Sequence, residues 1–478
     1  MTSARPLFNP FPGLRPFTTA DRHLFFGREA QTAELLARLQ RFRFLAAVGA
    51  SGSGKSSLVR AGLLPELYSG TLLPAGTHWR VALMRPGAAP LAHLTAALIE
   101  AGLFEPVDEF TPAIVRTALE RSRLGLTNAA RMSRLTPGEN LLVVVDQFEE
   151  LFRFRRRTAD TADPGKAFVD LLLEATRQTD VPIYVVITMR SDFLGDCARY
   201  RGLPEAINDC EYLVPRLTRE QWKLAIEGPV RVGGGTIAPR LTQRLLKDVA
   251  DDLDQLPTLQ HALMRTWGRW VAAGNASRPL DLEDYEAVGG LAEALSRHAD
   301  EAYESLPDDA HRRVAERVFR ALTDLSTDSR GVRRPTRFRD LVELVAAPEE
   351  QVRRVLEAFS GDGRGFLTPS SGIDDDTVID IAHESLMRIW RRLRVWAEAE
   401  AQSSRMFLRV AEAAALYKTK QAGLYRDPEL ELALQWRATN EPTAAWAEHL
   451  GAALDPVVEF LEAGRSARTA EAEAQAAA

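Results

Sequence analysis

The sequence predicts an α/β domain with a parallel sheet, followed by a helical region, a helix-and-hairpin region and a helical tail. Two observations carry this prediction. Near-continuous apolar runs in the first half of the chain alternate with helical patterns, as buried parallel strands and their crossover helices require. Beyond residue 215 helical periodicity dominates. A chain of 478 residues is also too long for one hydrophobic core, which favours several domains.

The predicted sheet belongs to a first domain, residues 1–215. Residues 41–67 have the pattern of a short buried strand, a glycine-rich turn and an apolar-periodic helix. Three more apolar runs predict strands: WRVALM (79–84), LLVVVD (141–146) and VPIYVVITMR (181–190). Each run is apolar at nearly every position, so both faces of the sheet are expected to be covered.

Three further regions follow the sheet domain. Residues 216–290 show helical periodicity alone and predict a helical lid domain. Residues 291–400 contain helices and then two strand-like runs, RGFLTPS and TVIDIA, joined by a Gly/Asp-rich turn. Helices followed by a hairpin have the outline of a winged helix. Residues 401–478 are rich in Ala, Glu and Arg and predict a helical linker or tail with no obvious core.

Composition excludes several classes of protein. A net charge of -6 gives no reason to expect general affinity for nucleic acid or anionic membranes. No stretch approaches the length that crosses a bilayer, and the opening residues do not form a signal peptide. The two cysteines, Cys197 and Cys210, neither staple a fold nor make a metal site. We therefore expect reduced thiols in a cytoplasmic protein.

The segment GASGSGKS (49–56) matches the pattern G-x-x-x-x-G-K-[ST] in full, between a predicted strand and a helix. The glycines let backbone N–H groups surround phosphate oxygens, and the following helix offers its positive N-terminus. Lys55 is expected to reach the β- and γ-phosphates, and the Ser56 hydroxyl to hold Mg²⁺. A plain Gly/Ser turn explains neither the Lys-Ser pair nor its context. The candidate nucleotide-binding residues here are Gly49, Ser51, Gly52, Ser53, Gly54, Lys55, Ser56 and Ser57.

Acidic residues follow the third predicted strand in LLVVVDQFEELF. Asp146 ends five apolar residues, where a carboxylate can face a magnesium ion through water. Glu149 and Glu150 come directly afterwards, and one of them is expected to polarise the attacking water. A helix N-terminus that carries acids explains the glutamates but not Asp146. Spacing does not decide between the glutamates; Glu150 is preferred, with Glu149 close behind.

Arg190 ends the next apolar run, in ITMRSD. A guanidinium at a strand end beside the phosphate loop can sense the γ-phosphate. The alternative is a salt bridge to Asp192 or Asp196. With two phosphate motifs upstream, the sensor role is preferred.

These motifs together resemble the STAND proteins, signal-transduction ATPases related to the AAA+ class and to NACHT-type members. LFFGRE (24–29), the phosphate loop, DQFEEL, TMR, LPTLQHAL and IAHESLMRIW occur in the order typical of that family. The opening NPFPGLRPF is similar to the bacterial novel-STAND group in particular, which is usually coupled to WD repeats. The resemblance covers residues 7–400 and implies an ATPase with ATP/ADP and Mg²⁺ as cofactors.

The resemblance assigns roles to four more residues. Gly27 and Arg28 match a segment that in STAND proteins lies beside the adenine and ribose. Pro257 matches the proline of the lid that packs on the base, although Gln255 and Leu256 stand where Gly-Leu or Ala-Leu is usual. His383 matches the winged-helix histidine that reaches the β-phosphate of bound ADP, a contact that imidazole can make as a donor.

The resemblance implies a switch rather than a motor. Such a protein holds ADP in a closed state, hydrolyses ATP slowly, and on exchange for ATP opens its lid and winged helix for assembly and signalling, including bacterial defence or regulation. It also implies self-association in the ATP state and a sensor or effector partner, such as WD repeats. No membrane partner is expected, and nucleic acid is not favoured. An arginine finger is not identified; residues 153, 155, 156 and 157 qualify only by charge.

Two other classes of function stay open. A winged helix with the basic runs RGVRRPTRFRD (330–340) and MRIWRRLR (387–394) is compatible with an ATP-dependent DNA-binding regulator. A conventional AAA+ remodelling ATPase predicts fast turnover and hexamers with ATP. A switch predicts instead a monomer that carries ADP.

Overall fold

A computed structural model of the chain describes residues 7–69, 78–105, 107–153, 163–249, 255–274, 278–324, 332–361 and 363–477. The chain divides into two compact units, Met1–Ala287 and Val288–Ala478. The first unit contains the sheet and the helices that follow it. The second contains short strands and the C-terminal helices.

The first unit is built on a five-stranded sheet in which every pairing is parallel, with the strand order β2-β3-β4-β1-β5. The strands are β1 (Phe44–Gly49), β2 (His78–Met84), β3 (Glu139–Val145), β4 (Ile183–Arg190) and β5 (Glu211–Leu213). The four strands predicted from apolar runs are confirmed. β5 is not predicted, because its three residues contain a single buried side chain, that of Tyr212.

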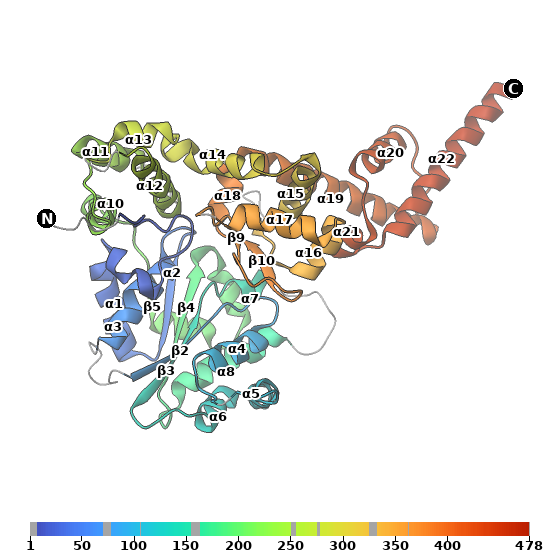
Figure 1. Cartoon of the computed structure of the whole chain (residues 1–478). Helices are drawn as coiled ribbons and strands as arrows, with labels where there is room; N and C mark the ends of the chain where they lie inside the picture. The colour runs from blue at the N-terminus through green and yellow to red at the C-terminus, as the bar shows by residue number, and fades with distance from the viewer. Residues whose placement is uncertain are drawn as a thin grey trace. The chain divides into compact units, whose positions relative to one another are not determined.

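Helices cover both faces of this sheet, as Figure 1 shows for α1 and α3 on one side and for α4 and α8 on the other. β3 illustrates why its sequence is continuously apolar. Leu142 and Val144 pack on the layer formed by α1 and residues 55–68, whereas Val143 packs on the opposite layer. The helices of the two layers are α1 (Glu29–Arg41), α2 (Lys55–Ser57), the π-helical turn η2 (Leu58–Leu63), α3 (Leu64–Tyr68), α4 (Pro90–Glu100), α5 (Thr111–Glu120), α6 (Gly125–Met132), α7 (Glu150–Arg153), α8 (Pro164–Arg177) and α9 (Leu203–Asp209).

Four helices after the sheet form the region predicted as a lid. They are α10 (Arg219–Val232), α11 (Pro239–Asp248), α12 (Gln255–Ala272) and α13 (Leu282–Ala287). α10 begins at a capping box in which the Thr218 hydroxyl accepts from the Gln221 backbone N–H and the Gln221 side chain accepts from the Thr218 N–H. The helices belong to the same compact unit as the sheet. The positions of these helices relative to the phosphate loop are therefore defined.

The second unit contains the predicted helices and hairpin. Helices α15 (Asp309–Ala321), α16 (Phe338–Val345) and α17 (Glu349–Ser360) precede the antiparallel pair β9 (Leu367–Thr368) and β10 (Val378–Ile381). An additional strand, β8 (Thr336–Arg337), pairs with the other edge of β10 and completes a three-stranded sheet. The remaining elements are α14 (Gly290–Glu304), the pair β6 (Thr323–Asp324) and β7 (Val332–Arg333), α18 (Glu384–Ile389), α19 (Arg391–Lys418), α20 (Glu429–Asn440), α21 (Ala444–His449) and α22 (Leu454–Ala477).

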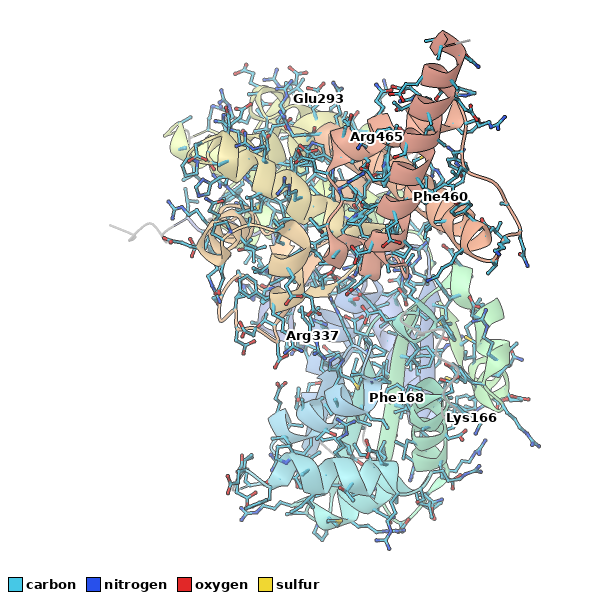
Figure 2. The ribbon with its side chains drawn as sticks, turned by 90° about the vertical axis from the view of Figure 1, so that its right-hand side faces the viewer. Lys166, Phe168, Glu293, Arg337, Phe460 and Arg465 are labelled. Atoms are coloured by element: carbon cyan, nitrogen blue, oxygen red, sulfur yellow. The ribbon has the colours of Figure 1, made fainter. Side chains whose placement is uncertain are left out.

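The C-terminal region has a core, contrary to the sequence prediction of a tail without one. α19, α20, α21 and α22 enclose a cluster that includes Phe407, Trp436, Phe460 and Leu461. Figure 2 labels Phe460 on α22, where its ring lies 5.1 Å from the Tyr425 ring in an edge-to-face arrangement. The core was missed because its apolar residues are widely spaced among Ala, Glu and Arg. α19 is also continuous through residue 400, where a domain boundary was predicted.

Replacing Leu461 with alanine is expected to destabilise this helical cluster by about 2–4 kcal/mol, because the side chain is fully buried and its removal leaves a cavity. Leu432 on α20 is 50% exposed and supplies the matched control, since Leu432→Ala removes the same atoms from the surface. Limited proteolysis should cleave the Leu461→Ala chain selectively within residues 401–478. Equal protease resistance of the two variants would contradict the presence of this core.

Within the described parts of the chain, no helix combines the length and the apolar character that spanning a bilayer demands. Cys197 and Cys210 are buried and unbonded to each other. Burial raises the pKa of the Cys197 thiol to about 12, so it remains protonated at neutral pH.

Candidate phosphate-binding site

The sheet order brings the predicted site residues to one edge. β4 lies between β1, which leads into the phosphate loop, and β3, which leads to Asp146. In the register, Gly49 is opposite Arg190, and Val145 is opposite Ile187. Because parallel strands end at the same edge, the loop, Asp146 and the end of β4 meet there.

The glycine-rich loop wraps around the start of the helix that follows it. Gly52 and Gly54 have φ of 71° and 87°, in the left-handed region that favours glycine. The Lys55 ammonium donates to two carbonyl oxygens of the loop, those of Gly49 (3.0 Å) and Ala50 (2.6 Å). Ser51 lies in the turn of the loop, and the Ser53 N–H donates to the Ala50 carbonyl at 3.3 Å. The loop therefore concentrates backbone N–H groups and one ammonium.

Asp146 is the hydrogen-bonding centre of the site and is 1% exposed. Its Oδ1 accepts from the Ser56 and Thr188 hydroxyls, each at 2.6 Å, and its Oδ2 accepts from Arg60 Nη2 at 2.8 Å. Burial opposes ionisation of this carboxyl, but the charges of Arg60 and Arg85 and the two hydroxyls outweigh it and lower its pKa. Asp146 is therefore a carboxylate at neutral pH.

The chemistry of these side chains fits a magnesium ion. The Ser56 hydroxyl donates a hydrogen bond to Asp146, so the lone pairs of its oxygen can face a hard cation. Among the described residues, no group of three or more His, Cys, Asp or Glu side chains forms a metal site. A magnesium ion at Ser56 and Asp146 would depend on phosphate oxygens and water for its other ligands, as is usual for this ion. It would neutralise phosphate charge there.

The two glutamates after Asp146 point to different partners. Glu149 Oε2 accepts from the Arg190 backbone N–H at 3.3 Å. Burial raises the pKa of Glu149, and the nearby charge of Lys55 acts in the opposite direction. Glu150 Oε2 accepts instead from the Gly87 N–H at 3.0 Å, in the loop after β2. Of the two acids, Glu149 is thus the one near Lys55 of the phosphate loop, whereas the sequence analysis preferred Glu150.

Arg190 is 9% exposed and makes the ion pair that the sequence offered as the alternative to a sensor role. Its Nη2 donates to Asp192 Oδ2, and its guanidinium lies 5.8 Å from the centre of the Phe193 ring. Arg153, a candidate finger, stacks on the same ring at 5.0 Å. Residues 155, 156 and 157 lie outside the described residues.

Gly27 and Arg28 connect the phosphate loop with its surroundings. A Cβ at Gly27, whose φ is +83°, would lie 2.5 Å from the Gln221 carbonyl oxygen, so this close approach to α10 requires glycine. Arg28 is 4% exposed and donates to the carbonyls of Ser53 (3.0 Å) and Pro215 (2.8 Å). Burial lowers the pKa of Arg28 to about 10, which leaves it charged.

The lid reaches the phosphate loop through the start of α12. A Cβ at Gly54 would lie 3.4 Å from Leu256 Cδ1, so this leucine covers the loop. Pro257 follows it and is half-buried. The lid segment predicted from the sequence is thus next to the loop, and the residue in contact is Leu256.

The opening segment of the chain joins the same two parts. Asn9 Nδ2 donates to the Met264 carbonyl of α12 at 3.0 Å, and the Phe11 ring packs edge-on against Trp267. Further along, the Phe17 N–H donates to the Ser57 hydroxyl at 3.1 Å. Ser57, predicted as a nucleotide contact, is therefore a partner of this segment in the structure.

His383 belongs to the second unit, where it caps α18. Its Nδ1 accepts from the Ser385 N–H at 3.1 Å and lies 2.9 Å from the Ser385 hydroxyl. Because the Ser385 N–H can only donate, Nδ1 is the acceptor and the neutral ring carries its proton on Nε2. Capping α18 is thus the role that the structure shows for His383.

Sequence patterns missed three residues of this site: Arg60, Thr188 and Leu256. A polar Thr188 inside the apolar run YVVITMR is a weak signal for a functional side chain. Arg60 carries no motif signal at all. Its contact with Asp146 depends on the strand order and on the π-helical turn η2, neither of which is apparent from residue spacing.

The chain has a phosphate loop at the carboxyl edge of a parallel sheet. The Lys55 ammonium bonds to that loop, and the Ser56 hydroxyl bonds to the buried Asp146. These features define a P-loop NTPase. A family model agrees with this class: the chain belongs to the Novel STAND NTPase 1 family, whose model matches residues 10–423. The resemblance found from the motifs is confirmed. No curated protein matches the sequence.

The comparison with solved structures gave matches of low sequence identity and low TM-score. The Aeropyrum pernix ORC1 protein in complex with DNA is 15% identical with a TM-score of 0.41, and the match covers 81% of this chain and 94% of that one. A Walker-type ATPase of Pyrococcus abyssi is 14% identical with a TM-score of 0.39, covering 80% and 99%. A RuvB variant of Thermotoga maritima is 14% identical with a TM-score of 0.34, covering 78% and 97%. The functions of these proteins do not transfer to this chain at such values.

Proposed function

We propose that this chain is a nucleotide-dependent signalling switch. ADP is held in a closed state, and its exchange for ATP releases the lid and the second unit for assembly. Hydrolysis of ATP is slow and restores the ADP state. The free energy for such a change comes from the different contacts that the two nucleotides make, as any population shift requires.

The observation that carries the proposal is the hydrogen bond between Ser56 and Asp146. Leu256 of the lid packs against Gly54 of the same phosphate loop. These contacts support a site for a nucleoside di- or triphosphate with Mg²⁺ that responds to lid movement. Membership of a STAND family supports a switch rather than a metabolic enzyme. Within this site, the geometry favours Glu149 as the base and leaves Glu150 as an anchor of the loop after β2.

In this proposal residues 309–381 form a winged helix. Residues 309–381 contain α15, the short strands β6, β7 and β8, the helices α16 and α17, and the strands β9 and β10. The pairing of β8, β9 and β10 after these helices, with β10 central in its sheet, supports that assignment. Asp380 of β10 pairs with Arg333, and both side chains are almost fully buried, which fixes the segment that leads to His383. His383 would then contact the β-phosphate of ADP.

The partners follow from the same proposal. Self-association in the ATP state, and a sensor or effector protein or domain such as WD repeats, would complete the signalling function. Neither a membrane nor a nucleic acid is required.

The charges of the first basic run, residues 332–340, favour this switch over a DNA-binding regulator. Each arginine of the described residues 332–340 lies within 4.0 Å of a carboxylate: Arg333 at Asp380, Arg334 at Asp324, Arg337 at Asp376 and Arg339 at Asp340 and Asp376. A phosphate-binding surface needs cations that are not already neutralised. A salt-sensitive gel shift with duplex DNA would support the regulator instead.

The proposal is tested by the nucleotide and the mass of the purified protein. A switch should co-purify with ADP as a monomer and gain mass with an ATP analogue. A nucleotide-free protein that forms hexamers with ATP and turns over rapidly would point to a remodelling ATPase. Identification of the nucleotide by chromatography and measurement of mass by light scattering distinguish these outcomes.

Replacing His383 with alanine is expected to speed ADP release by at least about tenfold, since a hydrogen bond to a charged group contributes roughly 1.5–3 kcal/mol. The alanine also removes the cap of α18, so His383→Asn is the matched variant: asparagine is a good cap but lacks the reach of the imidazole. Both variants should release labelled ADP faster. If asparagine restored the original rate, His383 would act only as a cap.

A further inference from the structure

Arg60 gives Asp146 a positive charge from within the chain. The two side chains form an ion pair of 2.8 Å, with Arg60 20% exposed and Asp146 1% exposed. A buried carboxylate requires such a partner, because burying an unpaired charge is very costly. In a P-loop site the magnesium ion normally faces this carboxylate. Arg60 therefore lies where the charge of the metal is otherwise needed.

The local structure holds Arg60 in this position. It belongs to the π-helical turn η2, five residues after Lys55. Its carbonyl accepts from the Thr19 hydroxyl at 3.3 Å, which fixes the backbone on the outer side. Two residues later, a Cβ at Gly62 would lie 2.5 Å from Thr32 Oγ1, so α1 packs directly on this turn. The helix cannot rotate without breaking these contacts.

The oxygens of Asp146 are largely used by the protein itself. Oδ1 accepts from two hydroxyls and Oδ2 accepts from Arg60, so three of roughly four lone-pair positions of the carboxylate are filled. A cation that approaches Asp146 must share it with the guanidinium. The two positive charges repel each other, and the burial of Asp146 keeps the solvent from screening this repulsion fully.

We propose that Arg60 is a resident counter-ion of Asp146 that weakens magnesium binding and so lets the site hold nucleoside diphosphate with little dependence on the metal. The inference rests on the proposed nucleotide site and concerns how strongly nucleotide binding at that site depends on the metal. It assigns Arg60 a positioning role: the residue acts on the cation through Asp146. Such a site would retain ADP when its metal dissociates, which suits a resting state.

The test uses Mn²⁺ as a spectroscopic substitute for Mg²⁺ and the full chain loaded with ADP. Arg60→Met is expected to raise the affinity for Mn²⁺, measured by electron paramagnetic resonance, at least tenfold. The substitution should also make ADP binding depend on the metal. In the unmodified chain, by contrast, the affinities for labelled ADP measured in Mg²⁺ and in EDTA should differ by less than about threefold. Arg60→Lys keeps a charge and should resemble the unmodified chain. Arg22→Met removes a surface arginine paired with Glu66 and should change neither quantity.

A double substitution tests whether the effect of Arg60 acts through Asp146, without leaving an unpaired buried charge. Arg60→Met removes the ion pair between Arg60 and Asp146, and the charge of Arg85 still acts on Asp146. Arg60→Met combined with Asp146→Asn removes both charges of the pair together. The gain in Mn²⁺ affinity should disappear in this double variant if it acts through Asp146. Unchanged or weaker Mn²⁺ binding by the folded Arg60→Met chain would overturn the inference. Absence of ADP binding by the unmodified chain would instead overturn the nucleotide site itself.

Discussion

Replacing Lys55 with alanine is expected to weaken binding of ADP and ATP at least about 100-fold, because each hydrogen bond to a charged group contributes roughly 1.5–3 kcal/mol. Lys55 is the ammonium of the phosphate loop, and its Nζ already lies within the loop, bonded to the carbonyls of Gly49 and Ala50. The change is measured by titration with a fluorescent nucleotide. Unaltered affinity in the variant would show that this loop is not the phosphate site.

The control for this experiment is another lysine of the same unit. Lys166 is exposed on α8, and its ammonium group lies 3.1 Å from Asp170 Oδ2. Phe168, two residues later, is fully buried. Figure 2 labels both residues. Lys166→Ala should bind nucleotide normally. The melting temperatures of both variants should be compared, since Lys55 also links two loop carbonyls. A normal melting temperature combined with lost binding assigns the effect to the phosphates.

The sheet was predictable because its strands are buried on both faces. LLVVVD and VPIYVVITMR are apolar at almost every position, and such runs became β3 and β4 with boundaries within about two residues, as expected for strong patterns. β5 was not predictable, since a three-residue edge strand buries too little to create a pattern. The core of α19–α22 was missed for a related reason: its aromatic residues are far apart in sequence and meet only when the helices pack.

The sequence predicts only part of the site, because some of its contacts depend on the three-dimensional arrangement of strands and helices. Lys55, Ser56 and Asp146 were found because each follows a strand within a motif of fixed spacing. The contacts of Thr188 and Arg60 with Asp146 depend instead on β4 lying between β1 and β3 and on a helix that widens into a π turn. The choice between two adjacent glutamates likewise depends on backbone direction. Gln147 has a positive φ of 56°, and this turn sends the following residues to different partners.

Replacing Glu149 with glutamine is expected to slow ATP hydrolysis by about 100- to 10,000-fold, the usual contribution of a general base. The amide oxygen can still accept from the Arg190 N–H, so the local structure should remain. Burial raises the pKa of Glu149 and makes it a stronger base than an exposed glutamate. Single-turnover hydrolysis of bound ATP measures the chemical step separately from exchange.

Glu150→Gln is the matched variant, because it makes the same change one residue away. Its amide oxygen can keep the bond to the Gly87 N–H, so it should retain most of the hydrolytic rate. Both variants should bind ATP as tightly as the unmodified chain, since neither side chain is a principal phosphate contact. The reverse outcome, loss of hydrolysis in Glu150→Gln with a normal rate in Glu149→Gln, would assign the base to Glu150, the residue that the sequence analysis preferred. It would also mean that the loop after β2 moves away from Glu150 when nucleotide binds.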